Sequence, residues 1–115
     1  MKLRIKGNSI RLRLTKGEVD ALRERGVVEE SVHFSATSRF TYALERGGDA
    51  VTASFDDGRV VVRVPNALAI EWCDTERVGI DGNAGDVRIL IEKDWQCLAP
   101  REEDESDAFP HPRAK

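Results

Sequence analysis

The chain has 115 residues and a mass of 12.9 kDa, which is room for one domain. Hydrophobic residues make up 40% and charged residues 34%, a composition typical of a soluble globular protein. No run approaches the roughly 18 apolar residues that cross a bilayer, the start lacks a signal-peptide core, and two distant cysteines, Cys73 and Cys97, exclude a disulfide scaffold. We therefore expect a reduced, cytoplasmic protein with no membrane contact.

The net charge of -3 conceals an uneven distribution along the chain. Residues 1–25 carry eight Lys and Arg against three Asp and Glu, whereas residues 26–100 carry seven against thirteen. The last fifteen residues carry three against five. The basic start of an acidic chain is therefore the feature that most needs an explanation.

Two alternating runs, residues 2–6 and 10–14, predict half-buried strands on either side of Gly7-Asn8-Ser9. A two-residue loop at Asn8-Ser9 places Leu3 opposite Leu14 and Ile5 opposite Leu12, with all four on the core side.

The other side of this hairpin is basic. The same register sets Lys6 opposite Arg11 and Arg4 opposite Arg13, with Lys2 just beyond. Like charges directly opposite destabilise a sheet, so we expect an anion nearby. Three sources are open: acids on a neighbouring strand such as Glu92 and Asp94, a nucleic acid or other polyanion, or the acidic end of the chain.

The following segment predicts a helix over residues 16–25. Thr15-Lys16-Gly17-Glu18 is a capping box, in which Thr15 and Glu18 each satisfy an unpaired backbone N–H. Acids precede arginines along the segment, as the helix dipole favours, and Gly26 provides the C-terminal stop.

Further strands are predicted at 27–34 and 38–45, followed by a hairpin with a type I′ turn at Asp57-Gly58. Counting outward from that turn pairs Phe55 with Val60 and, on the outer face, Asp56 with Arg59. Pro65 ends the hairpin.

Asn66 is predicted to cap a short helix over about 67–73. A last pairing is expected between residues 77–81 and 87–95, across a loop at 82–85. No internal repeat is visible in the sequence before Ala99. These elements predict one α+β domain over residues 1–99, mostly antiparallel or a small barrel, with seven to eight strands and two short helices. Residues 100–115 are acidic and contain proline, which predicts a disordered tail.

The sequence offers little for metal or catalytic chemistry. The two cysteines and His33 and His111 lack the short spacing of zinc ligands, so we expect no metal and no cofactor. Cys97 has no convincing base nearby, which leaves it a weak nucleophile candidate. Paired acids are explained by turns and solvated strand faces, and no P-loop, dinucleotide motif or serine elbow occurs. The sequence therefore predicts that the protein is not an enzyme.

Two resemblances follow from longer stretches. Residues 6–14, the capped helix and Val27-Val28 resemble the opening of the AbrB/MazE-type swapped-hairpin DNA-binding proteins. That resemblance implies an intertwined dimeric barrel and DNA contacts at Lys6, Asn8, Arg11 and Arg13. It departs from the family at Thr15, where proline is usual.

Over its whole length the chain looks more like a family of small uncharacterised bacterial proteins. The resemblance rests on residues 2–13, on residues 89–98, and on the ending at residues 103–107 with Phe109-Pro110-His111-Pro112. It implies a single small domain and no known activity.

The sequence thus predicts a small non-catalytic binding or interaction domain of unknown ligand. The alternative is a DNA-binding regulator or antitoxin-like protein that uses the basic hairpin, and a thiol- or metal-dependent enzyme comes third. The partner is a protein or a polyanion, with nucleic acid and a homodimer both compatible with the sequence. The residues expected to bind a polyanion are Lys2, Arg4, Lys6, Asn8, Arg11 and Arg13.

Overall fold

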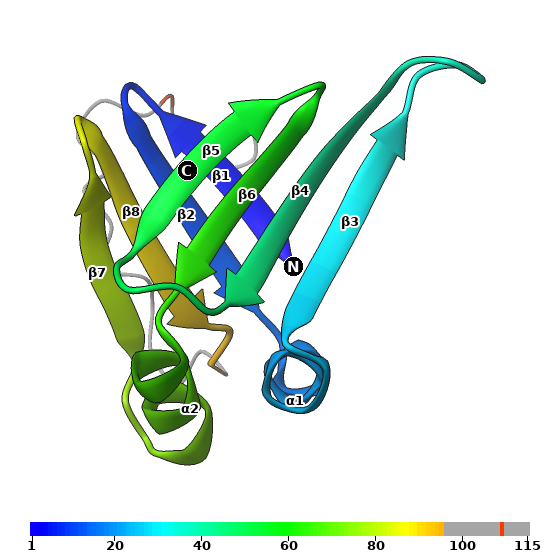
Figure 1. The fold of residues 1–115 in the computed structure, drawn as a ribbon. Helices are drawn as coiled ribbons and strands as arrows, with labels where there is room; N and C mark the ends of the chain where they lie inside the picture. Colours follow the sequence, from blue (N-terminus) through cyan, green and yellow to red (C-terminus); the bar gives the residue numbers. More distant parts are fainter. Residues whose placement is uncertain (96–108, 110–115) are drawn as a thin grey trace.

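The computed structural model describes residues 1–95 and Phe109, and over these residues the chain forms eight strands and two helices (Figure 1). In chain order they are β1 (Lys2–Lys6), β2 (Ser9–Leu14), α1 (Lys16–Arg25), β3 (Val27–His33), β4 (Arg39–Arg46), β5 (Thr52–Asp56), β6 (Arg59–Val64), α2 (Asn66–Asp74), β7 (Gly79–Ala84) and β8 (Val87–Lys93).

The strands form two four-stranded sheets. Sheet A has the order β1-β2-β8-β7 and sheet B the order β3-β4-β6-β5. Each sheet consists of two antiparallel hairpins joined by a parallel pair at its centre, β2 with β8 and β4 with β6. The predicted α+β class is confirmed, and four of the six strand pairs are antiparallel, as expected. The predicted small barrel is wrong, because the described strands form two mixed sheets that do not close into a barrel. Alternation reveals strands, but it does not reveal which distant strands pair.

The topology contains an internal repeat, which the sequence pattern did not predict. The order hairpin–helix–hairpin occurs twice, first as β1-β2-α1-β3-β4 and then as β5-β6-α2-β7-β8. Each unit gives its first hairpin to one sheet and its second hairpin to the other. The two units therefore exchange hairpins reciprocally within one chain, which gives the topology an internal two-fold relation.

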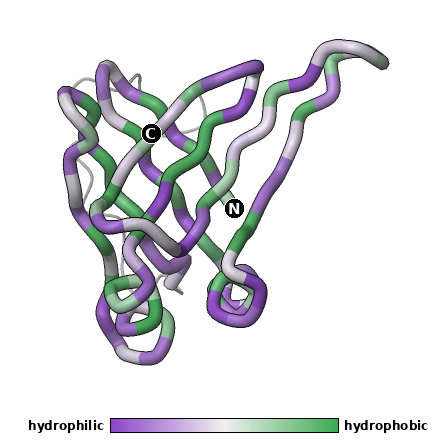
Figure 2. The backbone as a smooth tube through the Cα atoms, viewed as in Figure 1, coloured by the Kyte–Doolittle hydropathy of each residue, from purple (hydrophilic) through white to green (hydrophobic). Residues whose placement is uncertain are grey.

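The hydrophobic core lies between the inward faces of the two sheets. Hydropathy alternates along the strands, as expected for sheets with one buried face (Figure 2). The two helices lie together at one end of the sheets and close the core there with Val19, Leu22, Ala69 and Trp72 (Figure 1). The strand residues of this core cluster are Leu12, Leu14, Val28, Leu44, Val62, Val64, Ile80, Ile89 and Ile91.

Helix α1 agrees with its prediction at both ends. Thr15 Oγ1 accepts from the Glu18 N–H at 3.3 Å, Glu18 Oε1 accepts from the Thr15 N–H at 2.9 Å, and Gly26 ends the helix with φ of 82°. The predicted cap of α2 is wrong, because Pro65 holds the cap position and makes no side-chain cap hydrogen bond. Asn66 is the first residue of α2, and its Oδ1 accepts from Arg46 Nη1 at 3.0 Å instead.

Two turns differ from their predictions. The β1–β2 turn is Gly7-Asn8 rather than Asn8-Ser9, because Gly7 supplies the positive φ, 54°, that a two-residue loop needs at its first position. Leu3 therefore pairs with Leu12, not Leu14. The last hairpin turns at Gly85-Asp86 for the same reason, with a Gly85 φ of 62°. The Asp57-Gly58 turn and its register are confirmed.

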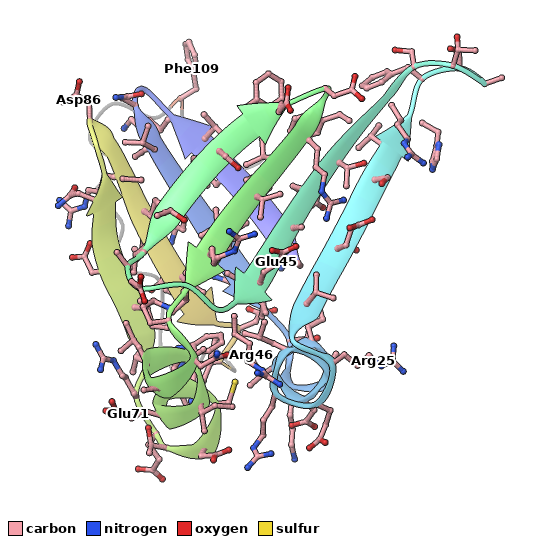
Figure 3. All side chains as sticks on the ribbon, in the orientation of Figure 1. Arg25, Glu45, Arg46, Glu71, Asp86 and Phe109 are labelled. Atoms are coloured by element: carbon pink, nitrogen blue, oxygen red, sulfur yellow. The ribbon has the colours of Figure 1, made fainter. Side chains whose placement is uncertain are left out.

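The end of the chain is described only at Phe109, whose side chain is 98% exposed (Figure 3). The predicted tail otherwise lies outside the described residues, as do Cys97 and His111. In the described part of the chain, the helices are too short and too polar to span a bilayer.

The amino group of Met1 is held in a cluster beside α1. It pairs with the Glu18 carboxylate and with Glu30 at 2.7 Å, and Tyr42 Oη donates to the Met1 carbonyl oxygen at 3.0 Å. Burial lowers the pKa of this amino group, but the hydrogen bonds and charges of Glu18 and Glu30 outweigh it and raise the pKa above 8.0. Burial raises the pKa of Glu18, but hydrogen bonds from Met1 and Thr15 outweigh it and lower the pKa below 4.5.

Glu18→Gln is expected to destabilise the protein near pH 6 and to have a smaller effect at pH 3. The depressed pKa of the Glu18 carboxyl means that its ion pair stabilises the fold above pH 4.5 and is lost as the pH falls through the folded pKa. The raised pKa of the Met1 amino group means that its contribution to stability is fully present below pH 8.0 and is lost as the pH rises through the folded pKa. Urea unfolding at both pH values measures the difference, with the exposed Asp20→Asn on the same helix as control. An equal loss for Glu18→Gln at pH 3 and pH 6 would contradict the ion pair as the cause.

Candidate polyanion-binding face

The outward side of sheet A carries a group of cations that we call the basic face. It comprises the outward side chains of β1, β2 and β8 at Lys2, Arg4, Lys6, Arg11, Arg13 and Arg88. Five of these six were predicted from the first hairpin. Arg88 was missed because its place beside Ser9 depends on the parallel pairing of β2 with β8.

Like charges do stand opposite one another on this face. The corrected register pairs Arg4 with Arg11 and Lys2 with Arg13, whereas the sequence predicted Lys6 with Arg11 and Arg4 with Arg13. The one-residue shift of the turn exchanges the partners but keeps every cation on the outer side, because each strand keeps its alternation.

Acidic neighbours neutralise part of the face. Arg11 Nε donates to Glu92 Oε1, and Lys2 Nζ lies 3.8 Å from Asp94 Oδ2, so the expected contribution of these two acids is confirmed. Arg88 Nη2 also donates to Asp81 Oδ2 at 3.2 Å. Among residues 1–95, three acids thus pair with cations of this face: Glu92, Asp94 and Asp81.

The basic face contains a shallow hollow of 270 Å³. Arg4 and Lys6 from β1, Arg11 from β2 and Arg88 from β8 surround it, and Leu90 contributes an apolar side chain. Lys2 and Arg13 lie on the same face outside the hollow. Cations from three strands thus converge on one depression.

The turns beside the hollow are fastened to each other. Asn8 Nδ2 donates to the Asp86 carbonyl oxygen at 2.7 Å, and the Arg88 N–H donates to the Asn8 carbonyl oxygen at 3.0 Å. Asp86 lies at the tip of the β7–β8 turn (Figure 3). The Asn8 amide group, which the sequence suggested as a ligand contact, is therefore engaged in holding the first hairpin against the last.

Sheet B has a corresponding hollow of 380 Å³ at the equivalent strand positions. Equivalent positions of the two sheets can be matched through their central parallel pairs, because Arg13 pairs with Glu92 in sheet A as Arg63 pairs with Glu45 in sheet B. On this alignment the four cations around the sheet A hollow correspond to residues that carry no positive charge: Ser54 for Arg4, Asp56 for Lys6, Val61 for Arg11 and Thr41 for Arg88.

The sheet B hollow is lined by two arginines, Arg39 and Arg59, and by two acids, Asp56 and Asp57, so its charges are balanced. Arg59 pairs with Glu29 and Glu45, and Arg63 Nη2 lies 2.8 Å from Glu45 Oε2. Glu45 lies on β4, near the end of the strand that meets α1 (Figure 3). The same strand arrangement thus exists with balanced charge, so the fold does not require a basic outer face.

Within the described residues, no three His, Cys, Asp or Glu side chains gather as a metal site would require. His33 lies opposite Arg39 on the outer side of sheet B, turned away from the core as the alternation predicted. Cys73 is half-buried on α2, and its thiol lies 3.7 Å from the Val19 carbonyl oxygen.

Cys73 is expected to react slowly with thiol reagents at neutral pH. Burial and, to a lesser extent, the charge of Asp74 raise the pKa of its thiol above 9.0, which lowers the thiolate fraction. Alkylation by iodoacetamide in a Cys97→Ser variant, followed by mass, should be several-fold slower in the native protein than in denaturant. Equal rates in the two conditions would show that the thiol is accessible and unperturbed.

Comparison with known proteins places the chain without naming an activity. It matches a family described as a family of unknown function, DUF7009, over residues 1–113. No curated protein matches the chain, and no solved structure matches it.

These findings decide between the two resemblances seen in the sequence. The likeness of the first quarter to AbrB/MazE-type proteins finds no support, and the partner strand of the β1–β2 hairpin is β8 of the same chain. The whole-length likeness to an uncharacterised family is confirmed. The chain belongs to DUF7009, a family whose function is unknown.

Proposed function

We propose that this protein is a binding domain without catalytic activity, and that its basic face holds the phosphate backbone of a nucleic acid. The supporting observation is the contrast between the two hollows. The sheet A hollow is lined by four cations and no acid, whereas the sheet B hollow is lined by two arginines, Arg39 and Arg59, and by two acids, Asp56 and Asp57. A gathering of cations that the equivalent hollow of sheet B does without, and that costs cross-strand repulsion, is accounted for by an anionic ligand.

The side chains of the basic face favour phosphates over bases as the contacts. Its outward positions on β1, β2 and β8 are occupied by arginine, lysine and small or acidic residues and by Leu90, and the hollow is also lined by Ile10. Proteins that bind unpaired bases usually stack them on aromatic rings. The chemistry of this face therefore supports binding that depends little on sequence, in contrast to a regulator that reads base edges.

The test is the binding of fluorescently labelled duplex and single-stranded oligonucleotides at about 50 mM salt, followed by anisotropy. Contact with about four phosphates predicts that log K falls with log salt at a slope near -3.6 for a duplex. Unrelated sequences should bind alike.

Matched variants locate the contact. Lys6→Gln with Arg88→Gln removes two charges from the basic face and should make the slope less steep by about 1.8. Arg59→Gln with Arg63→Gln removes two charges from the outer side of sheet B and should leave the slope unchanged. Absence of binding at low salt, or equal effects of the two pairs, would overturn the proposal. A strong preference for one sequence would instead favour the regulator.

A further inference from the structure

We infer that the hollow of the basic face is a seat for a single phosphate group, built by arginines that neighbouring carboxylates hold in position. The inference deepens the proposed function, on which it rests, by identifying one point of that face as a discrete site. Six cations attract a polyanion electrostatically without any fixed geometry. A site for one phosphate group needs hydrogen-bond donors whose positions and directions are fixed before the ligand binds.

Two of the three arginines at the hollow, Arg11 and Arg88, are each held along one edge. Arg11 gives its Nε hydrogen to Glu92, which leaves the two terminal nitrogens of its guanidinium for a ligand. Arg88 gives an Nη2 hydrogen to Asp81, which leaves Nε and Nη1. Glu92 and Asp81 are therefore positioning residues: each fixes a guanidinium and leaves donors unused.

The frame around these donors is also fixed. Arg88 follows the β7–β8 turn, which Asn8 ties to the β1–β2 turn through two hydrogen bonds. Ser9 Oγ donates to the Lys6 carbonyl oxygen at 2.6 Å, which braces the strand ends from which Lys6 projects. Donors from three strands thus meet at a hollow whose edges are held together by backbone and side-chain hydrogen bonds.

A phosphate group fits this chemistry. Its oxygens accept several hydrogen bonds at once, and arginine presents paired donors that match them. A nucleic-acid backbone and a free phosphate share this group. Because the volume of 270 Å³ is small, the hollow holds one phosphate group. The neighbouring phosphates of a nucleic-acid strand would contact Lys2 and Arg13 outside it.

The experiment titrates the full chain with inorganic phosphate at constant ionic strength, made up with chloride, and follows backbone amide shifts by NMR. We expect saturable shifts centred on Ser9, Arg11 and Arg88. Lys6→Gln with Arg88→Gln should weaken phosphate binding by at least about tenfold, since two charged hydrogen bonds are lost. Lys2→Gln with Arg13→Gln removes the same charge from the same face outside the hollow and should change the phosphate affinity less than about twofold.

The oligonucleotide assay on the same variants separates the two proposals. Both pairs should weaken binding of a duplex, because both remove phosphate contacts. Duplex binding without saturable phosphate shifts, or with equal phosphate affinity in the two pairs, would overturn the seat and leave the basic face as a diffuse surface. Saturable phosphate binding without duplex binding would overturn the nucleic-acid proposal and leave the seat with a free phosphate as its ligand.

Discussion

Replacement of Trp72 by alanine is expected to lower the free energy of unfolding by about 3–5 kcal/mol. The Trp72 side chain is fully buried where α2 covers the core. Its Nε1 donates to the Val78 carbonyl oxygen at 3.2 Å, and Lys93 Nζ lies 5.5 Å from its ring centre. Alanine removes the ring, leaves a cavity and deletes both contacts. Because domains of this size are stable by only about 5–15 kcal/mol, the loss is a large part of the total.

Two controls separate the sources of this effect, with urea unfolding followed by circular dichroism as the measurement. Trp72→Phe retains most of the ring and loses the N–H donor, so it should cost much less than alanine. Trp95→Ala removes an indole that is 54% exposed and should also cost much less. A loss below about 1 kcal/mol for Trp72→Ala would show that α2 does not seal the core.

Local sequence signals predicted the helices and turns well where a single residue type determines the backbone conformation. The capping box at Thr15 and Glu18 and the stop at Gly26 fixed both ends of α1, and Asp57-Gly58 fixed the register of its hairpin. Where two turn residues competed, as at Gly7-Asn8-Ser9, the prediction chose the wrong pair. The positive φ of Gly7 decided the actual turn, and every cross-strand partner in the hairpin shifted with it.

Long-range pairing could not be predicted, because nothing local specifies it. The parallel contacts of β2 with β8 and of β4 with β6 join segments that alternation describes separately. One signal does survive in the sequence: Leu44-Glu45-Arg46 and Ile91-Glu92-Lys93 have the same order of apolar, acidic and basic residues.

Those two segments have the same role in the fold. Arg46 lies between the helices and donates to the Leu22 carbonyl oxygen at 3.1 Å (Figure 3), and Lys93 donates to the Thr75 carbonyl oxygen at 2.6 Å. Each cation thus binds a carbonyl at the C-terminal end of one helix, where positive charge is favoured. A search for this pattern would have revealed the repeat.

In the candidate site, too, local sequence signals predicted one part and long-range strand pairing decided the rest. Five cations of the basic face follow from alternation in β1 and β2, and the two acids expected to neutralise them are in place. Arg88, which completes the hollow, and Asp81, which pairs with it, come from the β7–β8 hairpin, and only the fold brings them beside the first hairpin. The identification of a hollow, as distinct from a charged strand face, therefore required the structure.

Arg11→Gln and Arg13→Gln are expected to change stability in opposite directions, although the sequence gives both arginines the same alternation and charge. Arg11 is ion-paired with Glu92, whose side chain is only 19% exposed, so Arg11→Gln strands a carboxylate and should cost about 1–3 kcal/mol. Arg13 stands opposite Lys2, and Arg13→Gln relieves a like-charge pair worth about 0.2–1 kcal/mol. Urea unfolding at neutral pH measures both changes.

The double variant Arg11→Gln with Glu92→Gln isolates the pair. It should be more stable than Arg11→Gln alone, since no unpaired charge is left beside the strand, and the coupling should exceed about 0.5 kcal/mol. At the equivalent position of Arg13 on sheet B, Arg63 pairs with Glu45 but is 49% exposed, so Arg63→Gln should cost less than about 1 kcal/mol. If Arg11→Gln and Arg13→Gln both stabilise the fold, repulsion dominates the whole basic face and Glu92 does not neutralise it. In that case more cations of the basic face would be available to phosphates. The slope of log K against log salt for nucleic-acid binding should then be steeper than about -3.6.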